Sequence, residues 1–136
     1  ENPNSLFPIL ALIITNIANL HWSVNKCDVA EKEYVESISI NKKFATESPN
    51  IYNKRIAEAM NMLAYCYFKL EKYDLVFSTI EEAILLNPIT EYHDSQGELL
   101  MLMGRKEEAK KVYEKILEIE PTYFENNHTE FYKLLL

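Results

Sequence analysis

The sequence predicts an all-α protein built from three helical hairpins. Only two glycines and five prolines occur in 136 residues, too few for the many turns of a β-rich fold. In the middle of the chain, apolar and small side chains recur at the spacing of helix faces, and these are Met60, Leu63, Ala64, Tyr67, Val76, Ile80 and Ala83. The same offsets recur around Ala18 and around Gly97, which indicates a repeated pair of helices.

The composition is that of a folded, acidic protein. Apolar residues make up 48% of the chain and charged residues 26%, which favours a packed core over disorder. The formal net charge of −7 argues against nucleic acid as a partner, because phosphate binding depends on Lys and Arg. The same charge favours basic peptides or proteins.

The first hairpin is expected to consist of helices over residues 5–24 and 28–45. Pro8 is compatible with the first helix because amides of a first turn have no partner within the helix. Asn25 and Lys26 form the turn. The second helix carries an inward stripe consisting of Ala30, Tyr34, Ile38, Asn41 and Ala45.

Four of the remaining helices follow from periodicity and from helix-breaking residues, with expected ranges of 49–70, 74–86, 91–103 and 106–119. Pro88 follows the second of these and Gly104 ends the third. The helix over 91–103 matches the repeat least well, because His93 and Gln96 stand at positions that are apolar elsewhere. A seventh helix is expected over about residues 127–136.

The residues at the repeated offsets identify a family. Ala18, Ala64 and Gly97 are the small residues where two helices approach closely, and Pro88 and Pro121 close the second and third units. This pattern resembles the tetratricopeptide repeat (TPR), a helical hairpin of about 34 residues. The resemblance implies a right-handed α-α superhelix with repeats over about 5–46, 52–88 and 90–121 and a C-terminal capping helix. The longer first repeat is similar to the kinesin-light-chain-like class.

The amino end carries two further expectations. The chain begins without Met, at a point that aligns with the end of an inter-repeat turn, so we expect a single TPR domain that is a fragment of a longer protein. Residues 6–14 are almost entirely apolar, which is also seen in signal peptides. The acidic and polar flank, and a run well below the roughly 20 residues of a membrane span, favour a core helix and no membrane association.

No catalytic or metal-binding motif is recognisable. His21, His93 and His128 fall in three different helices, and two glycines cannot build a phosphate-binding loop. Cys27 and Cys66 lack metal-ligand spacing and are interpreted as packing thiols of a reducing, cytoplasmic compartment, with a disulfide between them as the alternative. We therefore expect no enzyme activity, no cofactor and no metal.

The TPR resemblance implies a concave groove lined by the first helix of each hairpin. Its side chains, called here the predicted groove residues, are Thr15, Asn19, Trp22, Glu58, Asn61, Tyr65, Phe68, Lys69, Glu91, Asp94 and Glu98. Aromatic groups suit adaptable peptide binding. The alternative is that some of these side chains pack between repeats.

One activity of the family depends on charge in this groove. Chaperone-binding TPRs hold a C-terminal carboxylate with lysines and asparagines, and Asn19 and Asn61 stand at the asparagine positions. Thr15 and Asp94 stand where basic residues belong. The groove is then acidic, which disfavours a chaperone-tail adaptor and favours basic peptides.

The sequence thus predicts a protein–protein interaction scaffold that binds a peptide or protein segment. Two alternatives stay open. One is a structural or self-assembly segment, with homo-oligomer contacts through the N-terminal helix pair. The other is a regulatory domain attached to a catalytic domain outside this chain.

Overall fold

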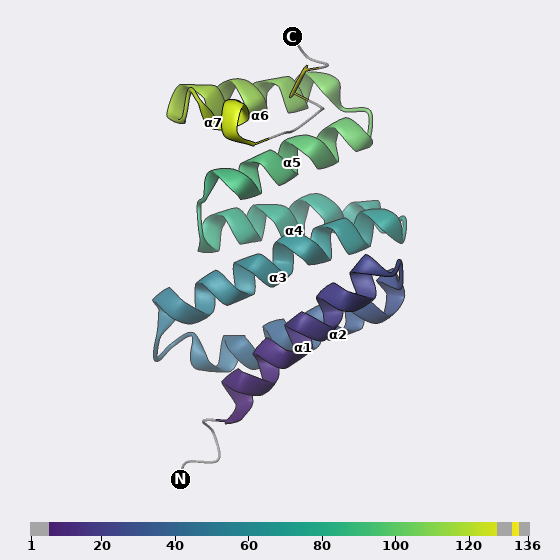
Figure 1. Ribbon diagram of the computed structural model, residues 1–136, viewed down its shortest axis with the longest axis vertical. Helices are drawn as coiled ribbons and strands as arrows, with labels where there is room; N and C mark the ends of the chain where they lie inside the picture. The colour runs from purple at the N-terminus through teal and green to yellow at the C-terminus, as the bar shows by residue number, and fades with distance from the viewer. Residues whose placement is uncertain (1–5, 128–131, 134–136) are drawn as a thin grey trace. The chain divides into compact units, whose positions relative to one another are not determined.

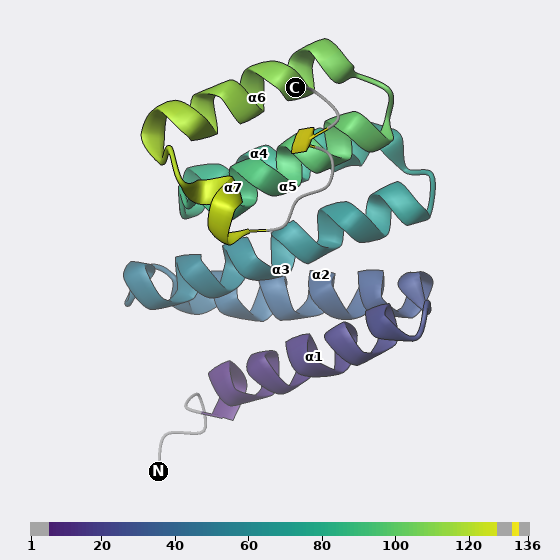
Figure 2. The same ribbon diagram turned by 45° about the horizontal axis from the view of Figure 1, so that its top comes forward.

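The computed structural model describes residues 6–127, 132 and 133, and every regular element in this part of the chain is a helix. The chain forms two compact units, residues 1–87 and residues 88–136. Each unit contains helical hairpins whose two members pack against each other, as Figure 1 and Figure 2 show.

The first unit holds four helices. They are α1 (Leu6–Ser23), α2 (Cys27–Phe44), α3 (Pro49–Lys69) and α4 (Tyr73–Leu86). Each helix packs against the next along the chain, and α1 also contacts α3. Every boundary lies within one residue of the range expected from the sequence.

The second unit holds α5 (Thr90–Leu102), α6 (Lys106–Ile119) and the short α7 (Tyr123–Asn126). Helices α5 and α6 form the third hairpin. The chain enters α7 directly after Pro121, and Tyr123 is 3% exposed. The helix expected over residues 127–136 falls largely outside the described residues.

The three hairpin turns share one backbone geometry. The second residue after the first helix has a positive φ, 66° at Asn25, 61° at Glu71 and 77° at Gly104. In the first turn the amide of Lys26 bonds the carbonyl of His21 at 2.8 Å, and the other two turns contain the same six-to-one bond. This is the Schellman motif, which satisfies the last carbonyls of a helix.

Both cysteines are packing thiols, as the sequence predicts. Cys27 and Cys66 are buried and neither forms a disulfide. Burial is the main cause that raises the pKa of the Cys66 thiol to about 12, and the neighbouring Cys27 adds to it. Cys66 is therefore a protonated, poorly nucleophilic group at neutral pH.

Helix α1 buries only a narrow strip of its surface. Ala11 and Ala18 are its only buried residues, and they face α2 with Thr15 and Trp22 half-buried beside them. The rest of the helix is apolar but exposed. By length and composition α1 could cross a membrane, with a mean hydropathy of 1.4. The core-helix interpretation therefore holds for its inner face alone.

The small residues at the repeated offsets are buried inside the packed helices. Ala18 and Ala64 are fully buried, and Gly97 of α5 is buried against α6. A Cβ atom built on Gly97 would lie 2.7 Å from Cε1 of Tyr113. Tyr113 itself is 2% exposed and its ring contacts Phe124 edge-on at 5.6 Å, so the ring has little room to move away.

Replacing Gly97 by Ala should therefore destabilise the second unit. The gain in helix propensity, about 1 kcal/mol, is opposed by overpacking against Tyr113, and we expect a net loss of about 1–2 kcal/mol. Chemical denaturation measures it. Combined with Tyr113→Leu, which removes the obstructing ring atoms, Gly97→Ala should no longer destabilise. A Gly97→Ala protein at least as stable as the parent would contradict this close contact.

Candidate functional site: the face shared by α1 and α3

The first unit brings eight of the predicted groove residues onto two neighbouring helices. Helix α1 carries Thr15, Asn19 and Trp22, all half-buried. Helix α3 carries Glu58 and Lys69, which are exposed, and three half-buried side chains, Asn61, Tyr65 and Phe68. The face is thus a partly covered surface rather than a row of free side chains.

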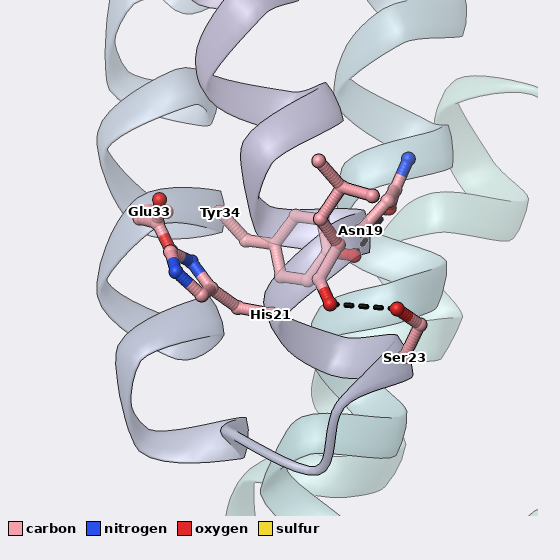
Figure 3. Close-up of polar contacts among 6 residues, drawn as sticks. Asn19, His21, Ser23, Glu33 and Tyr34 are labelled. Atoms are coloured by element: carbon pink, nitrogen blue, oxygen red, sulfur yellow. Dashed lines mark hydrogen bonds and ion pairs between the residues drawn. The ribbon is translucent and has the colours of Figure 1, made fainter.

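Asn19 is oriented by the hairpin beneath it. The hydroxyl of Tyr34, a fully buried residue of α2, donates a hydrogen bond to Oδ1 of Asn19. Because the oxygen is held by this bond, the amide nitrogen of Asn19 points away from Tyr34, as Figure 3 shows. The amide therefore offers its two N–H groups outward in a fixed orientation.

A second pair fixes the same part of α1. Nδ1 of His21 contacts Oε1 of Glu33, one residue before Tyr34 on α2. Figure 3 places this pair beside the Asn19–Tyr34 bond. His21 is thus half-buried and hydrogen-bonded rather than free, and the sequence did not indicate Glu33 as its partner.

Thr15 is used inside the hairpin. Its hydroxyl donates to the carbonyl of Ala11 at 3.0 Å and also meets the hydroxyl of Ser37 on α2. A threonine that bonds back onto its own helix and across to the next helix is occupied by structural contacts. Of the two polar groove residues on α1, Thr15 and Asn19, it is Asn19 whose amide nitrogen is turned away from the hairpin partner.

The side-chain oxygen of Asn61 is a hydrogen-bond acceptor without a donor in the described part of the chain. Its Oδ1 is buried and has no hydrogen-bond partner among the described residues. Leaving a buried acceptor unpaired costs about 1–3 kcal/mol, so a donor that reaches this atom would be bound favourably. Nearby aromatic contacts shape the same face. The ring centroids of Trp22 and Tyr65 lie 6.2 Å apart, which joins α1 to α3.

The predicted groove residues of the second unit lie on α5, and one of them is hydrogen-bonded to α7. The hydroxyl of buried Tyr123 donates to Oδ2 of Asp94 at 3.0 Å. Burial first, and then the charge of Asp94, raise the pKa of Tyr123. Glu91 is exposed and Glu98 half-buried. Asp94 therefore bonds within its own unit, a contact that was not predictable because Tyr123 lies far along the chain.

The charges of the two units differ. On the α1–α3 face, exposed Glu58 is balanced by exposed Lys69. The acidic character expected for the groove comes from Glu91, Asp94 and Glu98 of α5. The structure thus separates a neutral polar and aromatic face in the first unit from an acidic helix in the second.

Comparisons with known proteins agree with this architecture. The tetratricopeptide repeat family matches at residues 57–90 and again at residues 90–123. Human RNA polymerase II-associated protein 3 is 38% identical over 63 residues, which are 46% of this chain but only 10% of that protein. The chain therefore spans about a tenth of that relative's length.

Two solved structures are similar along most of the chain. The NMR structure of the first TPR domain of human RPAP3 has a TM-score of 0.70 and 28% identity, covering 94% of this chain and 88% of that one. The first TPR of Spaghetti (RPAP3), bound to the HSP90 peptide SRMEEVD, has a TM-score of 0.68 and 26% identity, covering 92% and 89%. The predicted all-α TPR fold is confirmed, and residues 57–123 of the chain consist of tetratricopeptide repeats.

Proposed function

We propose that this chain is a non-catalytic interaction module that binds a peptide segment of a partner protein on the face shared by α1 and α3. The observation that carries the proposal is the pair of asparagines. Asn19 presents N–H donors, because Tyr34 holds its oxygen, and Asn61 holds a buried acceptor without a partner among the described residues.

These two amides match the chemistry of a peptide backbone. A peptide carbonyl can accept from Asn19, and a peptide N–H can donate to Oδ1 of Asn61. Trp22 and Tyr65, whose rings contact each other, supply an aromatic surface on which an apolar side chain can pack. Because Asn19 is already held in place, little side-chain entropy is lost when a peptide binds there.

The related RPAP3 domain was solved with SRMEEVD, a peptide with an acidic end. In this chain the charges support a different preference. Thr15 and Asp94 stand where chaperone-binding TPRs carry basic residues, and both are engaged in internal hydrogen bonds. The face shared by α1 and α3 is itself neutral, but the whole chain carries a net charge of −7, which attracts basic segments at long range. We therefore extend the proposal to a preference for basic over acidic segments.

The charge preference predicts a simple ranking of peptides. SRMEEVD and the same peptide with its acidic residues replaced by lysine are compared by fluorescence anisotropy. The lysine peptide should bind more tightly, and its affinity should fall as salt screens the attraction. Tighter binding of SRMEEVD would overturn the basic preference and leave peptide binding standing. Binding of neither peptide would count against the peptide-binding function itself.

Asn61 allows binding to be separated from folding. Asn61→Leu removes the unmatched oxygen, so stability should stay equal or rise. Peptide affinity should fall three- to tenfold, about the value of one neutral hydrogen bond. Titration of the tighter peptide, with melting temperatures in parallel, measures both effects.

The matched control is Asn50→Leu, the same substitution at an exposed position of α3. It should leave peptide affinity unchanged. Equal affinity of the Asn61→Leu and parent proteins would show that Asn61 does not take part in binding.

A further inference from the structure

The outer face of α1 carries a regular apolar stripe. Large side chains alternate at steps of four and three residues, and the stripe consists of Leu6, Leu10, Ile13, Ile17, Leu20 and Val24. Each of them is at least 40% exposed. Val24 continues the helical hydrogen bonding with a 3.2 Å bond from its amide to the carbonyl of Leu20. Steps of four and three are the spacing of a coiled-coil seam, so the partner that fits this stripe is another helix.

The stripe and the peptide-binding face lie on opposite sides of α1. Ala11, Thr15, Ala18 and Trp22 turn inward, and at about 100° per residue they lie half a turn from the stripe. Contacts on the stripe therefore leave Asn19 and α3 accessible. A contact through the stripe can therefore form whether or not a peptide is bound.

The flanks of the stripe carry no charge. In coiled coils the residues beside the seam select the partner by charge. Here these positions hold Phe7, Ile9, Ile14 and Asn16, and no charged residue occurs from Leu6 to Leu20. His21 is the first ionisable side chain of α1, and it contacts Glu33. A chain of net charge −7 thus has one extended helix face on which an identical helix meets no like charge.

We propose that two copies of this chain associate through α1, with the two helices antiparallel across a twofold axis. The stripe positions are symmetric in sequence about position 15, so their spacing is the same from either end of the helix. An antiparallel pair therefore places Ile13 opposite Ile17 of the second copy, Leu10 opposite Leu20, and Leu6 opposite Val24. Every stripe residue meets another stripe residue, as an isologous interface requires.

The surroundings of the stripe enlarge this interface. A concavity of about 520 Å³ lies beside the first turns of α1, with an apolar wall of Phe7, Leu10, Ile40 and Phe44 and a charged rim of Glu36, Lys43 and Glu47 from α2 and the turn after it. In the antiparallel pair it lies next to the layer formed by Leu10 and the second copy's Leu20. With the exposed flanking residues, the apolar surface is on the order of several hundred Å², which approaches the area that each partner buries in a specific dimer. A contiguous patch of that size is comparable to the largest on a typical monomer, and such patches are often functional.

Sedimentation velocity of the 136-residue chain over a concentration series tests the proposal. The parent chain should show a monomer–dimer equilibrium. Ile13→Glu should raise the dimer dissociation constant about tenfold or more, because it places a carboxylate in the centre of the seam. Leu85→Glu is the matched control, since Leu85 on α4 is 84% exposed and lies outside the stripe. It should leave the dimer intact.

A mixing experiment tests the antiparallel register. Ile17→Lys should be as monomeric as Ile13→Glu, but a mixture of the two variants should form a heterodimer, since Glu at 13 then faces Lys at 17. Circular dichroism checks that each variant stays folded.

Four results would overturn the proposal. These are a parent chain that is monomeric at every concentration, a dimer that Ile13→Glu does not weaken, a dimer that Leu85→Glu weakens equally, and a mixture without heterodimer. Binding of a monomeric parent chain to uncharged phosphatidylcholine vesicles would assign the stripe to a lipid surface instead.

Discussion

Close contact between the two helices of each hairpin is the constraint on which the other features depend. Where α5 and α6 meet, Gly97 leaves no space for a Cβ atom because the ring of Tyr113 fills it. In the first hairpin the corresponding small residue is Ala18, and the large residue of the second helix is the fully buried Tyr34. A small residue facing a large one fixes the separation and the register of the two helices, and neighbouring side chains are then placed by that register.

The packing of α1 against α2 also orients a polar side chain of the candidate binding face. The ring of Tyr34 fills the interior of the first hairpin, and its hydroxyl reaches Asn19, the residue after Ala18. A packing residue thus also orients a polar group at the surface. Helix α1 consequently has two different faces. Its inner face holds Asn19 and Trp22 toward the peptide site, and its outer face carries the apolar stripe.

The helices were predictable because they depend on local signals. Apolar periodicity, Pro88 and Gly104 placed both ends of six helices within about a residue. The backbone geometry of the hairpin turns was harder to predict, because Asn25 and Glu71 adopt a positive φ although neither is glycine. At the candidate site, the sequence indicated which residues occupy groove positions. It did not indicate which of them form hydrogen bonds within the protein. Asp94 bonds to Tyr123 and Thr15 meets Ser37, and both partners are set by packing between segments distant in sequence.

The claim that a core contact presets the binding face is tested most directly by Tyr34→Phe. This variant keeps the ring in the hairpin and removes only the hydroxyl that holds Asn19. Peptide affinity should then fall as far as it does in Asn19→Ala, and the double variant should be no weaker than either single one, because both remove the same oriented amide. If Tyr34→Phe binds peptide as tightly as the parent chain while Asn19→Ala does not, the orientation of Asn19 does not depend on Tyr34.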